Sequence, residues 1–515
     1  MARFHAFFLI LLAGCGATPP APSTAARDRA IDDLLEHYDP PGLAVGVIEN
    51  GRVAYVRTAG ERIAGSGMPV DRRTLFKIAS NSKAMTAALL ARLVEAGRLR
   101  WDDPVKRHLP EFRLYDEWVT EHIEVRDLLV HNSGLPEGAG DLMLWPEPNH
   151  FTREDIIRGL AFLAPGYGFR SGYAYDNLLY VVAGEVAAAA GAASYEELMR
   201  REVFEPLGLD CRVGSWRTDE VANVAQPHVR HDGVNVPVRT DGPVVPAITS
   251  AAAGGIRCSL DAMLTWALNW LDPTPAQLAW LSEEQRSELW AARTPMPISA
   301  RRRAWFDTHY HAYAFGFRLA DADGAWTVSH TGTLMGMYSA MTLLPDEKSG
   351  FVLMLNGGGG QARAVLNDVL LKQLTAPEQG RTVAWFVEAL EREAAVPGGG
   401  EGPPDTSART PVPAGGLLGT GTWRDPWFGE VAICEENGTV RFASAKSPLL
   451  TGTVMRLGER YLVDWDDPSV DVEAWLDFST RGDGSGRLRM AKVDPDADFS
   501  FDYEDLDFTR VGGCD

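Results

Sequence analysis

The segment Phe76-Lys77-Ile78-Ala79-Ser80-Asn81-Ser82-Lys83-Ala84-Met85-Thr86 contains the only Ser-x-x-Lys sequence in the 515 residues. An extended run ends at Ser80, and an apolar helix follows it and closes at Gly97. A spacing of three places Ser80 and Lys83 on one helical face, about 5–6 Å apart at Cβ, so that ammonium and hydroxyl can meet. The helix N-terminus adds partial positive charge and free N–H groups beside the serine, which suits a developing oxyanion.

A structural role is the alternative for this pair, with Ser80 as a helix N-cap and Lys83 as a solvated surface residue. The helix after Ser80 is too apolar for a surface helix, because most of its positions from Ala84 to Val94 are Ala, Leu, Met or Val. We therefore expect Lys83 on a buried face, where a lysine needs a partner or a chemical task.

Length and composition indicate two folded domains with tails. A chain of 515 residues is too long for one ordinary core, and 45% apolar with 9% aromatic residues is typical of globular proteins. The net charge of −21 argues against binding to nucleic acid or to an anionic membrane surface. We interpret it as a solvated acidic surface.

The N-terminus resembles a bacterial lipoprotein signal. Arg3 precedes the apolar run 6–12, which is too short to span a bilayer, and Leu12-Ala13-Gly14-Cys15 has the small-residue cleavage pattern. The resemblance implies a signal peptide over residues 1–14, lipidation of Cys15, a tether over 15–27, and attachment to the outer membrane on its periplasmic side. An ordinary secretory signal with a chance cysteine is the alternative.

The remaining cysteines and the histidine pairs give no predicted metal site. The cysteines form no C-x-x-C or Cys/His cluster, and disulfides and buried free thiols both stay open: Cys211, Cys258, Cys434 and Cys514. Two histidine pairs have no third ligand at useful spacing, and we interpret them as loop or surface residues: His228 with His231, and His309 with His311.

The order of predicted elements favours an α+β domain over residues 28–395. A hairpin turns at Asn50-Gly51, a mostly helical part covers residues 153–210, and strand patterns return at 326–330, 338–344 and 351–355 before two helices. We expect one antiparallel sheet with strands from both ends of the domain, helices on its faces and the helical part inserted. A Pro/Gly-rich linker over 396–416 then leads to a small β-barrel or sandwich over 417–515.

Two further motifs complete a set with Ser80 and Lys83. Tyr175-Asp176-Asn177 is the only Tyr-x-Asn in the chain, and His330-Thr331-Gly332 ends a predicted strand. Ser-x-x-Lys, Tyr-x-Asn and (Lys/His)-x-Gly in this order resemble the penicillin-binding-protein and serine β-lactamase superfamily. The resemblance covers about residues 28–375 and is closest to class C β-lactamases, D-amino-acid-specific peptidases and β-lactamase-like esterases. Residues 419–511 look like the lipocalin-like domain that follows some of these hydrolases.

The resemblance implies a role for each matching residue. Ser80 is the expected nucleophile, Lys83 and Tyr175 share the general-base role, and a nearby ammonium keeps the pKa of the phenol low. Asn177 is expected to orient Lys83 and to bind a substrate amide, with His330 and Gly332 as further substrate-binding positions. Backbone N–H groups of Ser80 and Thr333 are the expected oxyanion hole, a contribution of about 3–4 kcal/mol per donor.

Position 330 departs from the pattern of most β-lactamases, which have lysine there. A neutral imidazole holds a carboxylate less firmly than an ammonium does, and histidine is typical of the esterase and aminopeptidase branches. We therefore expect a serine hydrolase of peptide, D-amino-acyl or ester bonds, without a cofactor. The alternatives are a true β-lactamase or D,D-carboxypeptidase, and a non-catalytic peptidoglycan-binding protein of the envelope.

Overall fold

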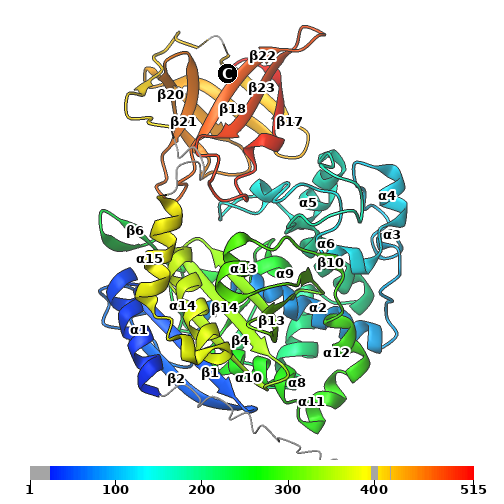
Figure 1. Cartoon of the computed structure of the whole chain (residues 1–515). Helices are drawn as coiled ribbons and strands as arrows, with labels where there is room; N and C mark the ends of the chain where they lie inside the picture. Colours follow the sequence, from blue (N-terminus) through cyan, green and yellow to red (C-terminus); the bar gives the residue numbers. More distant parts are fainter. Residues whose placement is uncertain (1–23, 396–403, 418, 515) are drawn as a thin grey trace, which may run out of the picture.

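The computed structural model describes residues 24–395, 404–417 and 419–514. The predicted signal peptide, the lipidation site Cys15 and most of the predicted tether lie outside the described residues. The chain forms a larger α+β domain and a smaller β-barrel that stands on it (Figure 1). Helix α1 (Thr24–Tyr38) begins inside the range predicted as tether.

The larger domain is built on an eight-stranded antiparallel sheet with the order β10-β11-β12-β13-β14-β15-β1-β2. Its first and last parts meet where β1 pairs with β15, so the sheet joins both ends of the domain as predicted. The hairpin at Asn50-Gly51 is confirmed, with both residues at positive φ. The strands are β1 (Gly42–Glu49), β2 (Arg52–Gly60), β10 (Thr294–Pro295), β11 (His311–Tyr313), β12 (Arg318–Ala322), β13 (Ala325–Leu334), β14 (Met337–Leu344) and β15 (Ser349–Leu355).

Helices cover both faces of this sheet, which is why its central strands read as continuous apolar runs. Along β1, Leu43, Val45 and Val47 face one core, and Ala44 and Ile48 face the other. The first core contains α1, α14 (Gly359–Thr375) and α15 (Val383–Ala394), which Figure 1 shows together on one side. The second contains α2 (Ser82–Glu95), α6 (Leu178–Gly191) and α10 (Leu260–Leu271).

The inserted part, predicted to be mostly helical over residues 153–210, is mostly helical in the structure. After α6, the chain continues through α7 (Tyr195–Met199), a π-helical turn (Arg200–Phe204) and α8 (Glu205–Leu207). Among the described residues, no single helix is long and apolar enough to cross a membrane. The bent pair formed by α6 and the 195–207 segment satisfies that criterion only jointly, and most of α6 is buried inside the domain.

The smaller domain is a closed barrel of eight antiparallel strands, because β17 pairs with β24 and β20 pairs with β21. In addition, β16 (Thr410–Pro411) pairs with β20, so the second half of the segment predicted as linker packs on the barrel. The barrel strands are β17 (Gly421–Asp425), β18 (Gly429–Glu436), β19 (Thr439–Ser444), β20 (Thr451–Leu457), β21 (Arg460–Trp465), β22 (Ala474–Thr480), β23 (Gly486–Lys492) and β24 (Asp507–Gly512).

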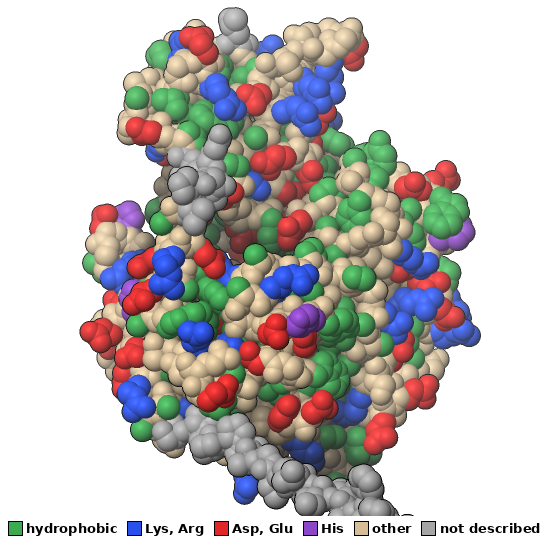
Figure 2. Space-filling model, in the orientation of Figure 1, with side chains coloured by type: hydrophobic (Ala, Val, Ile, Leu, Met, Phe, Trp, Pro, Cys, Tyr) green, Lys and Arg blue, Asp and Glu red, His purple; other side chains and the backbone are tan. Residues whose placement is uncertain are grey.

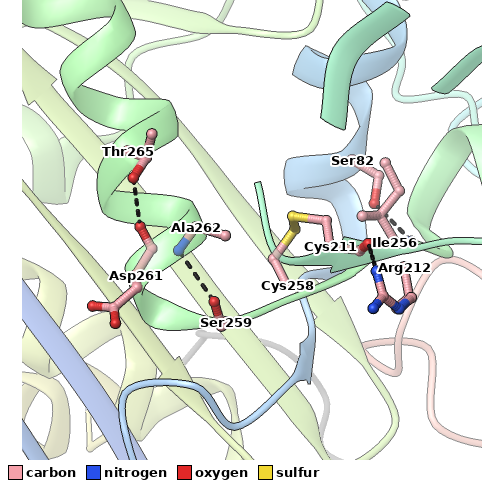
Figure 3. Close-up of a disulfide and its surroundings, with 9 residues drawn as sticks. All are labelled: Ser82, Cys211, Arg212, Ile256, Cys258, Ser259, Asp261, Ala262 and Thr265. Atoms are coloured by element: carbon pink, nitrogen blue, oxygen red, sulfur yellow. Dashed lines mark hydrogen bonds between the residues drawn. A yellow bond between two sulfur atoms is a disulfide. The ribbon is translucent and has the colours of Figure 1, made fainter. Parts of the chain in front are cut away.

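Two disulfides settle the pairing that the sequence left open. Cys211 bonds to Cys258 and joins β4 (Cys211–Arg212) to β9 (Arg257–Cys258), which also pairs with β3 (Phe76–Lys77) ahead of Ser80. Figure 3 shows this bond together with Ser82, whose Oγ accepts a hydrogen bond from the Ile256 backbone N–H at 3.2 Å. The second disulfide, Cys434–Cys514, fastens the C-terminal segment to β18.

The Cys434–Cys514 bond is expected to stabilise the barrel, because it closes 80 residues of chain. The double substitution Cys434→Ala/Cys514→Ala should lower the free energy of unfolding of the barrel by about 2–4 kcal/mol. Its melting temperature should fall by about 10 °C or more. Thermal unfolding followed by circular dichroism measures the difference, with oxidised wild type as the reference. An unchanged melting temperature would show that the two cysteines are not bonded in the protein.

Candidate active site

Ser80 lies on a constrained turn between β3 and α2. The preceding Ala79 adopts φ +48°, a left-handed conformation that costs a residue with a Cβ about 1–2 kcal/mol. The turn is fixed on both sides of Ile78, whose N–H donates to the Ile256 carbonyl at 3.0 Å and whose carbonyl accepts from Ser339 Oγ at 2.7 Å. Neighbouring strands therefore hold the turn that presents Ser80 at the start of α2.

Gly332 allows β13 to approach this turn. A Cβ at position 332 would lie 2.3 Å from the Ile78 carbonyl oxygen and 2.5 Å from Ser339 Oγ, so no other residue fits without displacement of the backbone. Ser80, Thr331 and Thr333 consequently line the same pocket. This close approach explains the glycine of the His-Thr-Gly motif, while the predicted contact of Gly332 with substrate stays a prediction.

Lys83 is fully buried and donates three hydrogen bonds. Its Nζ lies 3.2 Å from Ser80 Oγ, 2.7 Å from Asn177 Oδ1 and 2.9 Å from the Ala253 carbonyl oxygen. The oxygens of Asn177 and Ala253 can only accept hydrogen bonds. In its neutral form, the Lys83 amine therefore donates its two hydrogens to them and turns its lone pair toward Ser80. Burial lowers the pKa of Lys83 to about 7, with Asp141 acting in the opposite direction and Arg318 in the same one.

Tyr175 is buried against the same lysine, with Lys83 Nζ 4.8 Å from the centroid of its ring. Burial raises the pKa of the Tyr175 phenol above its ordinary value of 10, while Arg318 and a hydrogen bond with Ser80 lower it only in part. The structure differs here from the sequence-based expectation of a low phenol pKa. The phenol is therefore protonated near neutral pH, and the general-base role predicted for Tyr175 is less suited to it than to Lys83.

Asn177 is held by an acid that is itself bonded to a serine from the barrel. Its Nδ2 donates to Asp141 Oδ2 at 2.8 Å, which turns Oδ1 toward Lys83. The same Asp141 oxygen accepts a hydrogen bond from Ser500 Oγ at 2.9 Å. A chain of hydrogen bonds thus runs from the barrel to Lys83, and it supports the orienting role predicted for Asn177.

The barrel reaches the site through the connection between β23 and β24, residues 493–506. Asp502 accepts hydrogen bonds from the backbone N–H groups of Gly140, at 2.5 Å, and Leu142, at 3.0 Å. Phe499 packs edge-on to Tyr175 with 5.8 Å between ring centroids, and its carbonyl oxygen would lie 2.6 Å from a Cβ at Gly138. The 493–506 connection therefore forms one wall of the active site.

His330 does not face the pocket, in contrast to its predicted substrate-binding position. It is fully buried, with Nε2 2.8 Å from the Tyr313 hydroxyl and Nδ1 2.7 Å from the Thr331 carbonyl oxygen. Burial lowers the pKa of His330 well below its usual range, with Arg318 and Lys83 adding to the effect. Both ring nitrogens are occupied, so a neutral His330 supports the wall and does not bind a substrate anion.

The pocket between the two domains has a volume of about 790 Å³, which suits a small-molecule or peptide substrate. Figure 2 shows acidic side chains in the hollow where the barrel meets the larger domain. The lining includes, from the larger domain, Ser80, Glu137, Tyr173, Tyr175, Asn177, Arg318, Thr331 and Thr333, and from the barrel Ser469, Asp471, Asp498, Phe499, Ser500 and Phe501.

Three residues of this site were not identified from the sequence. Asp141, Arg318 and Ser500 belong to no short motif. Only tertiary structure brings Arg318 and Ser500 into the pocket of Ser80 and places Asp141 against Asn177. The surface interpretation of the histidine pairs is wrong for His228, which is buried between the Asn356 carbonyl and the Ala64 N–H. No group of histidine, cysteine and acidic residues suited to a metal ion is found among the described residues.

The larger domain is similar to known proteins. A sequence model described as Beta-lactamase matches residues 27–375. An unguisins hydrolase of Aspergillus campestris is 26% identical over 71% of this chain and 68% of its own length, and the esterase EstB of Burkholderia gladioli is 33% identical over 44% and 60%.

A solved structure has the same fold over almost the whole chain. The octameric penicillin-binding protein homologue from Pyrococcus abyssi superposes with a TM-score of 0.58 at 18% identity, over 94% of this chain and 99% of the other. The family match covers more than half of the chain and coincides with the domain that carries Ser80, Lys83, Tyr175 and Asn177. The protein therefore belongs to the beta-lactamase family, within the serine hydrolases of the β-lactamase and penicillin-binding-protein superfamily.

Proposed function

We propose that the protein hydrolyses peptide, D-amino-acyl or ester bonds through an acyl-enzyme on Ser80. The observation that carries the proposal is the environment of Lys83. Its Nζ lies 3.2 Å from Ser80 Oγ, and the oxygens of Asn177 and Ala253, which can only accept hydrogen bonds, bind its other hydrogens. Neutral Lys83 takes the Ser80 proton as Oγ bonds to the substrate carbonyl carbon. The proton then passes, directly or through Tyr175, to the leaving group as the scissile bond breaks.

Water completes the cycle. Lys83 accepts a proton from the attacking water, the second tetrahedral intermediate collapses, and the proton returns to Ser80 Oγ with release of the acid. The backbone N–H groups of Ser80 and Thr333 are the proposed oxyanion hole, since both residues line the pocket on opposite sides of the gap that Gly332 keeps narrow.

Peptidase or esterase activity is favoured over β-lactam hydrolysis in this proposal. His330, at the position of the lysine that β-lactamases use, is buried and neutral. True β-lactamase or D,D-carboxypeptidase activity is the enzymatic alternative. A non-catalytic peptidoglycan-binding role is disfavoured because binding alone has no need for a lysine of lowered pKa against a serine.

We also propose a location in the bacterial envelope, with Cys15 lipidated and the enzyme attached to the outer membrane. The sequence of the first 15 residues supports this location, and two disulfides among the described cysteines suit an oxidising compartment.

Labelling of Ser80 tests the mechanism. Protein lacking residues 1–23 is incubated with a fluorophosphonate and, separately, with a fluorescent penicillin, and adducts are mapped by mass spectrometry. We expect a fluorophosphonate adduct on Ser80 that is absent from Ser80→Ala. Ser82→Ala is the matched control, because Ser82 is a buried neighbour that bonds to Ile256.

A penicillin adduct on Ser80 in the same experiment would favour the β-lactamase or carboxypeptidase alternative. If folded protein gives no adduct with either probe, the acyl-enzyme mechanism is wrong and the binding role becomes the leading one.

The pH dependence of hydrolysis follows from Lys83. Because the neutral amine is the base and its pKa is about 7, kcat/KM for an ester should rise about tenfold per pH unit below pH 7 and level off above it. A profile from pH 5 to 9 at constant ionic strength measures this limb. A rise centred above pH 9 would instead assign the base to the phenol of Tyr175.

The barrel wall is expected to restrict substrate length, and Phe499 is the residue to change. A single substitution is a cleaner test than removal of the whole barrel. Removal would take Asp502 from the Gly140 and Leu142 N–H groups and Ser500 from Asp141, and so would disturb the surroundings of Lys83. Phe499→Ala should therefore raise kcat/KM for long peptide or acyl substrates relative to short ones, by about tenfold.

Phe478→Ala is the control for this prediction, since Phe478 packs on Trp423 and Tyr461 within the barrel. If Phe499→Ala leaves the length preference unchanged in folded enzyme, the barrel does not limit substrate length.

A further inference from the structure

The segment 250–258 runs along the helix that carries Lys83. The carbonyl oxygen of Ala253 accepts a hydrogen bond from Lys83 Nζ at 2.9 Å. The carbonyl oxygen of Ala252 accepts one from Thr86 Oγ1 on the same helix at 2.7 Å. One of the acceptors that hold the lysine thus belongs to this segment, and its position depends on how the segment is fixed.

The same segment also holds the turn that presents Ser80. The Ile256 carbonyl oxygen accepts a hydrogen bond at 3.0 Å from the N–H of Ile78, which precedes the serine. The Ile256 N–H donates at 3.2 Å to the Oγ of Ser82, which follows it (Figure 3). Displacement of Ile256 would therefore move the chain on both sides of Ser80.

A disulfide fixes the end of this segment. The segment ends with β9, which lies between β3 and β4 in a three-stranded sheet, and each of these strands is 2 residues long. Such short strands form few hydrogen bonds, and Cys258 is bonded to its strand partner Cys211 on β4. The neighbouring Arg257 lines the pocket and pairs with Asp241, while both cysteines are buried in the core. The disulfide is therefore the covalent anchor of β9 on its buried side.

We propose that the Cys211–Cys258 disulfide is a positioning element of the active site, so that the enzyme gains its activity when this bond forms. The inference rests on the proposed function of Ser80. Exchange of the two thiols with a disulfide compound such as oxidised glutathione forms the S–S bond and releases two reduced thiols, which balances atoms and electrons. The reduced chain keeps its fold but holds Ala253 and Ile256 loosely, which confines hydrolysis to an oxidising compartment.

The effect of the bond on Lys83 is measurable because it changes the access of water. Burial is the largest cause of the lowered Lys83 pKa of about 7. A segment without its anchor admits water to the amine, and hydration of the ammonium raises the pKa. A change of this pKa reports on the segment, because the charged groups that act on Lys83 lie outside it: Asp141, Asp176 and Arg318.

Removal of the bond tests the proposal. The double substitution Cys211→Ala/Cys258→Ala is made in protein without residues 1–23, which keeps every described element. The rate at which a fluorophosphonate labels Ser80 is then measured from pH 5 to 9. We expect the rate at pH 7 to fall about tenfold or more, because small displacements of base and nucleophile slow the reaction strongly. The midpoint of the pH profile should rise by about one pH unit.

Cys434→Ala/Cys514→Ala is the matched control, since it removes the other disulfide, which lies in the barrel. That bond closes 80 residues of chain against 47 for Cys211–Cys258, so its loss should destabilise the protein at least as much. The control should nevertheless keep the labelling rate and the midpoint of wild type. Circular dichroism at the assay temperature shows that both variants are folded.

Stepwise reduction of wild type with a phosphine gives the same comparison if the Cys211→Ala/Cys258→Ala variant does not fold. Alkylation and peptide mapping measure the reduced fraction of each disulfide. The labelling rate should fall with the reduced fraction of Cys211–Cys258 and should be independent of that of Cys434–Cys514.

Failure of the inference and failure of the proposed function give different results. A folded Cys211→Ala/Cys258→Ala variant with the rate and midpoint of wild type would show that the bond only stabilises the fold. Equal losses in both variants, or a rate independent of the reduced fraction of Cys211–Cys258, would also overturn the inference. Absence of labelling in oxidised wild type would reject the proposed function itself.

Discussion

The burial of one lysine against one serine determines how the larger domain is built. Lys83 brings a charged group into a core that would exclude it, and the domain offsets this with acceptors from three separate elements: Ser80 on its own turn, Asn177 before α6, and Ala253 on the short helix α9 (Ala251–Gly254). The pKa of about 7 is the consequence, because desolvation outweighs the contacts. The left-handed Ala79 and the close approach of Gly332 shape the turn that presents Ser80 next to this lysine.

The barrel contributes to the same arrangement, so residues of both domains hold the surroundings of Lys83 in place. Asp141 holds Asn177, Ser500 holds Asp141, and Asp502 fixes the backbone on either side of Asp141. Burial raises the pKa of both Asp141 and Asp502 well above the usual range. Two buried acids of this kind persist only where each is hydrogen-bonded, which ties the geometry of Lys83 to the docking of a domain more than 300 residues away in the chain.

Local signals in the sequence predicted what local structure determines. Ser80 and Lys83 could be paired because a three-residue spacing on a helix has one geometry, and the Asn50-Gly51 hairpin follows from the backbone preferences of its turn. Arg318, Asp141 and Ser500 could not be found in this way, because their significance depends on strand order and on domain docking. The predictions for the pKa of Tyr175 and the orientation of His330 were wrong for a related reason. Burial sets the first and the hydroxyl of Tyr313 sets the second, and both depend on tertiary structure.

The net charge of the protein bears on what its pocket attracts. With a charge of −21, the molecule repels an anion at long range, and the acidic side chains Glu137, Asp471 and Asp498 line the pocket. Attraction of an anionic compound therefore cannot come from the overall field. It would have to come from contacts made inside the pocket, where polar side chains act at hydrogen-bond distance.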